Sequence, residues 1–305
     1  VRRSAETSQR SAKAGTSWDK TILKQSWAGD IDYLAVHSYN GETVSNVNRI
    51  ITYLKQNITE SGHTGIKVAY TEHGTSIPAN RENYWRGIGL SSALCEAQFF
   101  NRVFTEPIVD VANLHSFTLY PGPWGVGYEK DDGTFSAGAS YRLMDMYARN
   151  AIGNVMESHI DNFETVPTSV VGWDGYDHTK QFWKDGKYGY SCSAVETADG
   201  EMNLFIANPR NHKLRLTLDL DEKYADYSVR EVQTVSGKRS GDTANSYDGY
   251  ADIPDGSGGY TRQYADDMVY TTDTDADRDS LTITPYSVTM IKLSGAKTDF
   301  TAAQY

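Results

Sequence analysis

The chain has 305 residues, which predicts about two domains, and 39% of them are hydrophobic, which excludes a wholly disordered chain. The net charge of −11 argues against the clustered basic surface that nucleic acids and anionic membranes require, and no apolar run reaches the ~20 residues of a membrane span. The two cysteines, Cys95 and Cys192, exclude a disulfide framework and a cysteine-rich zinc site.

The chain begins with Val rather than Met, and its first residues form a polar, basic stretch. This stretch lacks the apolar core of a secretory signal peptide, so it predicts no compartment. We expect residues 1–29 to be a polar lead-in that was cut from a longer protein.

Residues 30–154 alternate between two kinds of pattern. Short apolar runs, typical of buried parallel strands, lie at 31–36, 66–71 and 109–114. Apolar residues at helical spacing predict helices over about 44–58, 88–104 and 138–149. Strand and helix alternating in this way predict βα units on a parallel sheet.

The pattern changes after residue 154, where helical periodicity stops and short β-branched or aromatic runs follow. These runs lie at 169–171, 188–195, 203–208, 214–218, 228–235 and 281–293. Alternation within several of them predicts antiparallel strands with one wet face, and hence a β-sandwich over 155–296. We expect 237–280 to form long loops or an insertion, and 297–305 to form a tail.

Reactive side chains gather at the carboxyl ends of strands in parallel βα folds. Candidate side chains follow all three predicted strands: His37, Tyr39 and Asn40 follow the first, Glu72 and His73 the second, and His115 and Trp124 the third. Glu72 matters most, because a carboxylate directly after an apolar strand is either ionised for a task or neutralised by a partner. A structural role remains open for each residue taken singly. Their joint occurrence at three strand ends favours a functional site.

Three segments together resemble the last three strands of a clan A glycoside hydrolase barrel: DYLAVHSYN at 32–40, VAYTEHGTS at 68–76 and VANLHSFTLYPGPW at 111–124. The chain is most similar to the C-terminal half of family fifty-one α-L-arabinofuranosidases. In that family a helix with a stretch like ALCEAQFFNR at 93–102 follows the nucleophile strand, and a closing β-sandwich ends in a segment like PYSV at 285–288.

The resemblance implies a fold and a set of roles. The fold is the last three βα units of a TIM-type barrel over 30–154, followed by an antiparallel β-sandwich. Glu72 matches the catalytic nucleophile, and His37 and Tyr39 match residues that line the site and orient this carboxylate. We expect Asn40, His73, His115 and Trp124 to contact substrate, although the family usually carries Trp and Asn where this chain has His73 and Gly74.

A retaining glycosidase needs a second carboxyl group ~5–5.5 Å from the nucleophile, to protonate the leaving oxygen. Residues 30–154 supply three predicted strands, whereas a complete barrel has eight and needs about 250 residues. Glu42, Glu82 and Glu129 fall in predicted loops or helix starts and are poor substitutes. We therefore expect the acid/base upstream of Val1, and we expect the isolated chain to be catalytically weak.

The predicted function is retaining hydrolysis of L-arabinose-containing polysaccharides or oligosaccharides. The resemblance implies no cofactor and no metal, and a glycan rather than a nucleic acid or a membrane as partner. It also implies self-association, which is common among family members. Two alternatives remain open: another clan A activity, such as that of a β-xylosidase or xylanase, and a carbohydrate-binding remnant without catalysis.

Overall fold

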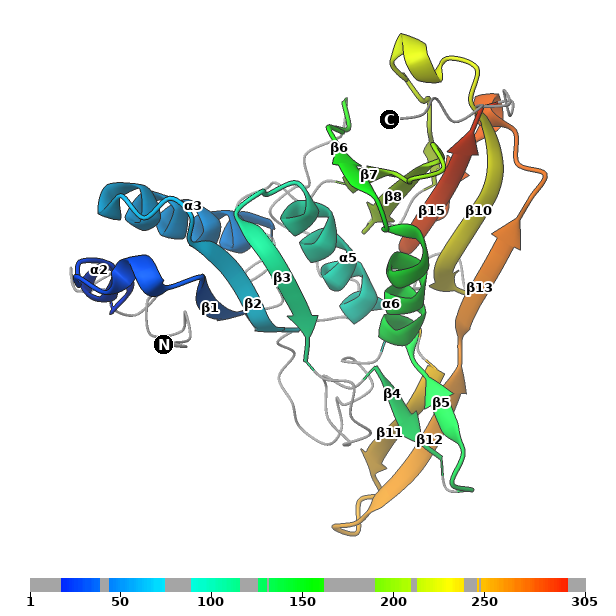
Figure 1. Ribbon diagram of the computed structural model, residues 1–305. Helices are drawn as coiled ribbons and strands as arrows, with labels where there is room; N and C mark the ends of the chain where they lie inside the picture. Colours follow the sequence, from blue (N-terminus) through cyan, green and yellow to red (C-terminus); the bar gives the residue numbers. More distant parts are fainter. Residues whose placement is uncertain are drawn as a thin grey trace.

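The computed structural model describes residues 18–38, 44–74, 89–115, 126–130, 132–161, 190–209, 213–238, 246 and 248–295. Figure 1 shows a parallel sheet with helices at one end of the molecule and a large antiparallel sheet at the other. None of the helices in these ranges is long and apolar enough to cross a bilayer. Cys95 is buried, Cys192 is partly buried, and both are free thiols.

The parallel sheet has three strands in the order β1 (Tyr33–Ser38), β2 (Lys67–His73) and β3 (Val109–Leu114). Helix α3 (Val44–Ser61) connects β1 to β2, and helix α5 (Leu90–Phe104) connects β2 to β3. The predicted alternation of strand and helix is confirmed here, with β3 at its predicted bounds and β1 and β2 within two residues of theirs.

The lead-in of the sequence prediction is partly structured. Helix α2 (Trp18–Leu23) lies within residues 1–29, buries Ile22 and Leu23 and packs on α3. A 3-10 turn, η1 (Ala28–Asp30), then leads into β1. The polar lead-in predicted for residues 1–29 therefore ends before α2, where two apolar side chains are buried.

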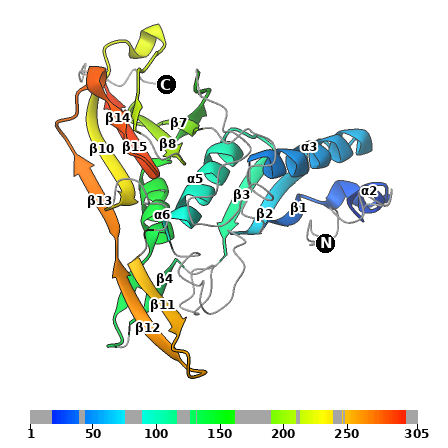
Figure 2. The same cartoon turned by 180° about the vertical axis from the view of Figure 1, so that it is seen from behind.

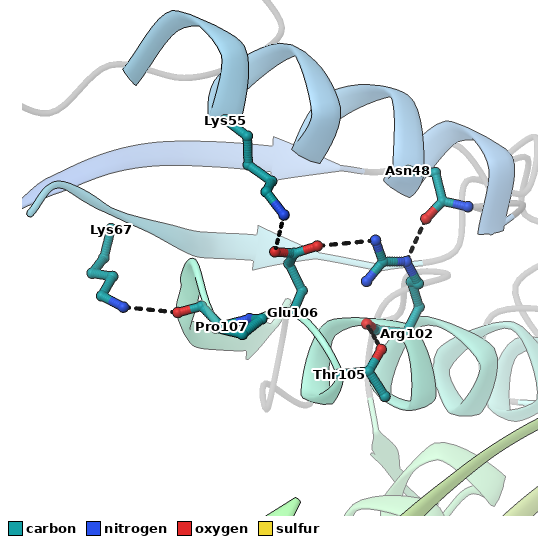
Figure 3. A network of polar contacts seen from close by, with 7 residues as sticks. All are labelled: Asn48, Lys55, Lys67, Arg102, Thr105, Glu106 and Pro107. Atoms are coloured by element: carbon teal, nitrogen blue, oxygen red, sulfur yellow. Dashed lines mark hydrogen bonds and ion pairs between the residues drawn. The ribbon is translucent and has the colours of Figure 1, made fainter. Parts of the chain in front are cut away.

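A polar network holds α3, α5 and the start of β3 together (Figure 3). The Glu106 carboxylate, 7% exposed, accepts hydrogen bonds from Lys55 Nζ at 2.9 Å and from Arg102 Nη2 at 3.1 Å. Desolvation raises the pKa of Glu106, but the bonds from Lys55 and Arg102 outweigh it and lower the pKa overall. Arg102 also donates to Asn48. This network follows the carboxyl end of α5, at the amino edge of the sheet, where side chains serve stability.

Helix α6 (Ala139–Asn150) follows a short hairpin of β4 (Gly127–Glu129) and β5 (Phe135–Ala137). The helix lies within one residue of its predicted range. The Gly138 N–H donates to the Val126 carbonyl at 2.9 Å, which closes the hairpin directly before the helix.

The second part is a six-stranded antiparallel sheet in the order β13-β10-β15-β8-β7-β6. In chain order its strands are β6 (Asn154–Met156), β7 (Ser191–Glu196), β8 (Met202–Asn208), β10 (Ser228–Gly237), β13 (Met268–Asp273) and β15 (Ser287–Ser294). The predicted strand at 169–171 lies outside the described residues.

A small second layer covers this sheet. Strands β9 (Leu214–Arg215) and β14 (Thr282–Ile283) form a ladder, and Ile283 is buried in one cluster with Ile291 and Leu293 of β15. Two 3-10 turns, η4 (Glu222–Tyr224) and η6 (Arg278–Ser280), connect neighbouring strands. Within the described ranges, the predicted β-sandwich is thus a six-stranded sheet with a two-stranded partner layer.

The predicted run 281–293 is divided into β14 and β15. Pro285 carries no backbone N–H to continue a ladder, and Tyr286 adopts a φ of 43°, so the chain turns between the two strands. The run therefore supplies one strand to each layer.

We expected long loops or an insertion over 237–280, and the expectation of long loops is wrong for the residues described there. The described residues from 248 to 273 form the hairpin of β11 (Asp248–Pro254) and β12 (Tyr260–Asp266), and then strand β13 (Met268–Asp273). Strand β12 is exposed on both faces and needs no apolar alternation, so its composition gives no signal to a pattern-based prediction. The β11–β12 ribbon reaches away from the rest of the molecule (Figure 1).

The two parts share a hydrophobic core and a buried polar network. Tyr147 of α6 stacks on Phe205 of β8, with ring centroids 4.4 Å apart. The Asn101 side chain of α5 accepts hydrogen bonds from Tyr147 Oη and Ser193 Oγ, both at 2.8 Å, and donates to Ser191 Oγ at 3.1 Å. Because a buried amide without partners is costly, this network fixes how α5 and α6 lie on β7.

Candidate active site

Glu72 and His37 face each other at the carboxyl edge of the parallel sheet. They are register partners on β2 and β1, and His37 Nδ1 lies 3.3 Å from Glu72 Oε2. The His37 side chain is 27% exposed and the Glu72 side chain 36%, so a ligand can reach both groups. At this separation, a proton on Nδ1 would lie between the imidazole and the carboxylate and would fix the orientation of Glu72.

A register shift decides which face of β2 carries the carboxylate. Val36 pairs with Tyr70, but the next residue, His37, pairs with Glu72, so Thr71 is an extra residue on β2. Strict alternation would place Glu72 on the same face as the fully buried Val68 and Tyr70, against the helices. The extra residue turns Glu72 to the opposite, more open face.

The same shift turns His73 into the core. Its side chain is 2% exposed, stacks on Phe99 at 4.1 Å between centroids, and meets Phe100 edge-on at 5.1 Å. Desolvation lowers the pKa of His73 to about 3, so the ring is neutral. The prediction that His73 contacts substrate does not fit this position, because the ring packs on α5 on the face away from Glu72.

His115 directly follows β3 and lies at the same edge. Its backbone N–H donates to the His73 carbonyl at 2.8 Å, and its side chain is partly buried. The structure thus brings His37, Glu72 and His115 to the ends of three neighbouring strands. The other predicted site residues, Tyr39, Asn40 and Trp124, lie outside the described residues, as do Glu42 and Glu82.

The three strands do not supply a second carboxylate near Glu72. Asp110, the acid on β3, precedes Val111, which pairs with Ala69, three residues before Glu72. At ~3.3 Å per residue, Asp110 lies roughly 10 Å or more from Glu72 along the sheet. It also accepts a hydrogen bond from Tyr33 Oη at 3.0 Å, at the amino edge. No group of three His, Cys, Asp or Glu side chains suited to a metal ion occurs among the residues that the structure describes.

The sequence analysis did not identify Glu96 as a buried carboxyl group. Glu96 of α5 is 4% exposed, and Ser92 Oγ donates to its Oε1 at 3.0 Å. Desolvation raises the pKa of Glu96 to about 8, against the smaller lowering effect of bonds from Ser140 and Ser92. The sequence feature that could have indicated this buried carboxyl group is the position of Glu96 among apolar residues in ALCEAQFFNR at 93–102. Glu96 lies in the helix layer rather than at the carboxyl edge, so we assign it to the core.

No family model matches the sequence, and no curated protein matches it. Solved structures do match. A structure titled as an arabinofuranosidase aligns with a TM-score of 0.64 at 16% identity, over 91% of this chain and 55% of that one. The GH51 α-L-arabinofuranosidase from Thermotoga petrophila RKU-1 aligns with a TM-score of 0.63 at 17% identity, over 94% of this chain and 60% of that one.

A glycoside hydrolase of a different family aligns less closely. It is a β-porphyranase of family 86 from the human gut bacterium Bacteroides plebeius, with a TM-score of 0.52 and 10% identity over 87% of this chain and 41% of that one. At such identities the similarity shows a shared fold. The chain spans 55% of the first arabinofuranosidase structure, which fits the C-terminal half indicated by the sequence resemblance.

Proposed function

We propose that this chain is the nucleophile-bearing part of a retaining glycoside hydrolase acting on L-arabinose-containing polysaccharides or oligosaccharides. The observation that carries the proposal is the pairing of Glu72 with His37 on the open face of the sheet, at its carboxyl edge. The shared fold with arabinofuranosidases supports it, and at 16% identity it supplies no residue roles.

Glu72 is proposed to attack the anomeric carbon of a terminal arabinofuranose. The glycosidic bond breaks, the leaving oxygen keeps the electron pair, and a glycosyl ester forms on the carboxylate. Water then hydrolyses this ester. His37, with Nδ1 3.3 Å from the carboxylate, is proposed to hold it in one orientation, and Tyr39 is proposed to assist it. Asn40, His115 and Trp124 are proposed to contact the sugar.

The acid/base carboxyl group is proposed to come from a barrel segment outside residues 1–305. The supporting observation is the distance of Asp110 from Glu72 along the sheet, which exceeds the separation that a retaining mechanism needs. Without this group, a poor leaving oxygen is not protonated and no base activates water against the ester. The isolated chain should therefore react only with strongly activated glycosides, and the ester should persist.

The test is mass spectrometry of the intact chain after incubation with dinitrophenyl α-L-arabinofuranoside, whose phenolate leaves without protonation. We expect one arabinosyl adduct, mapped to the peptide that carries Glu72. Azide, a nucleophile that needs no base, should remove it. Glu72→Gln should abolish the adduct. Glu60→Gln, a matched change on the exposed face of α3, should keep it. An adduct of equal yield on Glu72→Gln, or none on the parent chain, contradicts the proposal.

The second candidate function is another clan A activity, such as that of a β-xylosidase. The observation that favours it is the fold shared with a glycoside hydrolase of a different family, the β-porphyranase. A parallel incubation with dinitrophenyl β-D-xyloside separates the two. Labelling by the xyloside and not by the arabinofuranoside would indicate another clan A activity. Polysaccharide binding without an adduct from either reagent would indicate a binding remnant.

A further inference from the structure

The β11–β12 hairpin is firmly anchored at its base. Asp248, the first residue of β11, accepts hydrogen bonds from Tyr270 Oη at 2.7 Å and from the Met268 N–H at 3.2 Å. The guanidinium of Arg142 on α6 lies 4.7 Å from the centre of the Tyr270 ring. These contacts tie the ribbon to both β13 and α6, so its direction is fixed by the fold.

The hairpin base lies at the edge of the molecule that carries Glu72. Ser246, just before β11, accepts a hydrogen bond from the Leu90 N–H at 2.9 Å. Leu90 begins α5, the helix that follows β2, and a helix after a strand starts on the side of that strand's carboxyl end. The β4–β5 hairpin, which follows β3, contacts β11. Both hairpins extend beyond the carboxyl end of β3 (Figures 1 and 2).

One face of β12 alternates aromatic and charged side chains. Tyr260, Arg262 and Tyr264 share this face because side chains two residues apart point the same way. The two tyrosines are 45% and 51% exposed. We call these three residues the tyrosine face. On β5, Phe135 is 47% exposed, so the two adjacent hairpins hold three of the eight large hydrophobic side chains exposed in the described part of the chain.

The charge on the tyrosine face is neutralised within the hairpin. Arg262 Nε donates to Asp252 Oδ1 at 3.0 Å, and Asp252 is 7% exposed. Asp255, in the turn between β11 and β12, adds negative charge, whereas Asp266 pairs with Lys238 at 3.3 Å. This arrangement suits a neutral ligand with apolar C–H faces and many hydroxyl groups, and it disfavours an anionic one.

We propose that the tyrosine face binds a neutral glycan chain, as a site for sugar units remote from the bond that Glu72 attacks. The exposed tyrosine rings stack on sugar C–H faces. β12 has seven residues, so the ribbon extends the binding surface by roughly 20 Å. The inference rests on the proposed function for the choice of glycan. To that function it adds recognition of the polymer at a distance from the bond that is cleaved.

The test is native electrophoresis of the full chain in gels that contain arabinan, arabinoxylan or the acidic polymer polygalacturonate. We expect the two neutral polymers to retard the chain and polygalacturonate not to. The double variant Tyr260→Ala/Tyr264→Ala should bind the neutral polymers roughly tenfold more weakly, which corresponds to about 1.4 kcal/mol. Tyr33→Ala, a matched change at a 43% exposed tyrosine on β1, should bind like the parent.

Labelling of Glu72 by the dinitrophenyl arabinofuranoside should be equal in the parent and the double variant, because this reagent has no remote sugar units. Unchanged retardation of the double variant, or no retardation of the parent, overturns the inference. Loss of a dimer in sedimentation with unchanged retardation also overturns it and identifies a second copy as the occupant. Retardation that depends on both tyrosines, together with an unlabelled Glu72, supports this site and overturns the proposed catalysis instead.

Discussion

His37 and Glu72 are register partners on adjacent parallel strands, with Nδ1 and Oε2 3.3 Å apart. Both side chains remain partly exposed, so this pair contributes little to folding stability. Its effect is on orientation, because a carboxylate held from one side presents its other oxygen in a defined direction. Positioning of this kind has a large effect on the reaction rate and a small effect on the free energy of unfolding.

Replacing His37 by Gln should slow labelling of Glu72 by the dinitrophenyl arabinofuranoside roughly ten- to hundredfold, because the carboxylate loses its orienting donor. Time-resolved mass spectrometry measures this rate. The melting temperature should change little, since both groups are partly exposed. His159→Gln, at a 76% exposed histidine, is the matched control and should label like the parent. Equal rates for both variants would refute the orienting role.

Glu96 should make the stability of the chain fall as the pH rises. The pKa of Glu96 is about 8 in the folded chain, against the ordinary 4.5, so the unfolded chain loses this proton first. The stabilising contribution is therefore complete below pH 4.5 and is lost as the pH rises toward 8. Glu96→Gln should show a flatter profile in urea unfolding and should exceed the parent in stability at pH 8. A profile parallel to that of the parent would contradict the burial of an ionisable Glu96.

His73 should act in the opposite direction. The pKa of His73 is about 3 in the folded chain and 6.5 in its ordinary state, so the unfolded chain binds the proton first as the pH falls. The contribution of the neutral ring is present above pH 6.5 and is lost toward pH 3. His73→Gln should be less stable than the parent at pH 7, because the contact with Phe99 is lost. In urea unfolding, the difference in unfolding free energy between the parent and His73→Gln should be smaller at pH 4 than at pH 7. A difference independent of pH would indicate that only the packing of the ring, and not its neutral state, contributes to stability.

Asn101→Leu should destabilise the chain by about 2–4 kcal/mol, because it leaves the buried hydroxyls of Tyr147 and Ser193 without their acceptor. Ser191→Ala removes only the contact to the Asn101 amide and should cost about 1 kcal/mol. Urea unfolding compares the two variants. Equal losses would show that the network does not act as a unit between α5, α6 and β7.

Much of the secondary structure could be predicted from the sequence, because the signals are local. The apolar positions of α3 have helical spacing, and Gly62, with a φ of 80°, follows Ser61, the last residue of that helix. The bounds of β3 follow from a short apolar run. Strand β12 could not be predicted this way, because neither of its faces is buried in a core that would impose an apolar period.

The sequence by itself determined that a carboxylate, Glu72, and an imidazole, His37, each follow an apolar strand. Only the tertiary structure decided that these two side chains meet and that His73 turns inward. Alternation along β2 is a local rule, whereas the extra residue at Thr71 exists only relative to the pairing of β2 with β1. A register shift of one residue exchanges the two faces of a strand. The pairing of β2 with β1 therefore determines which side chain lies on the exposed face and is available for chemistry.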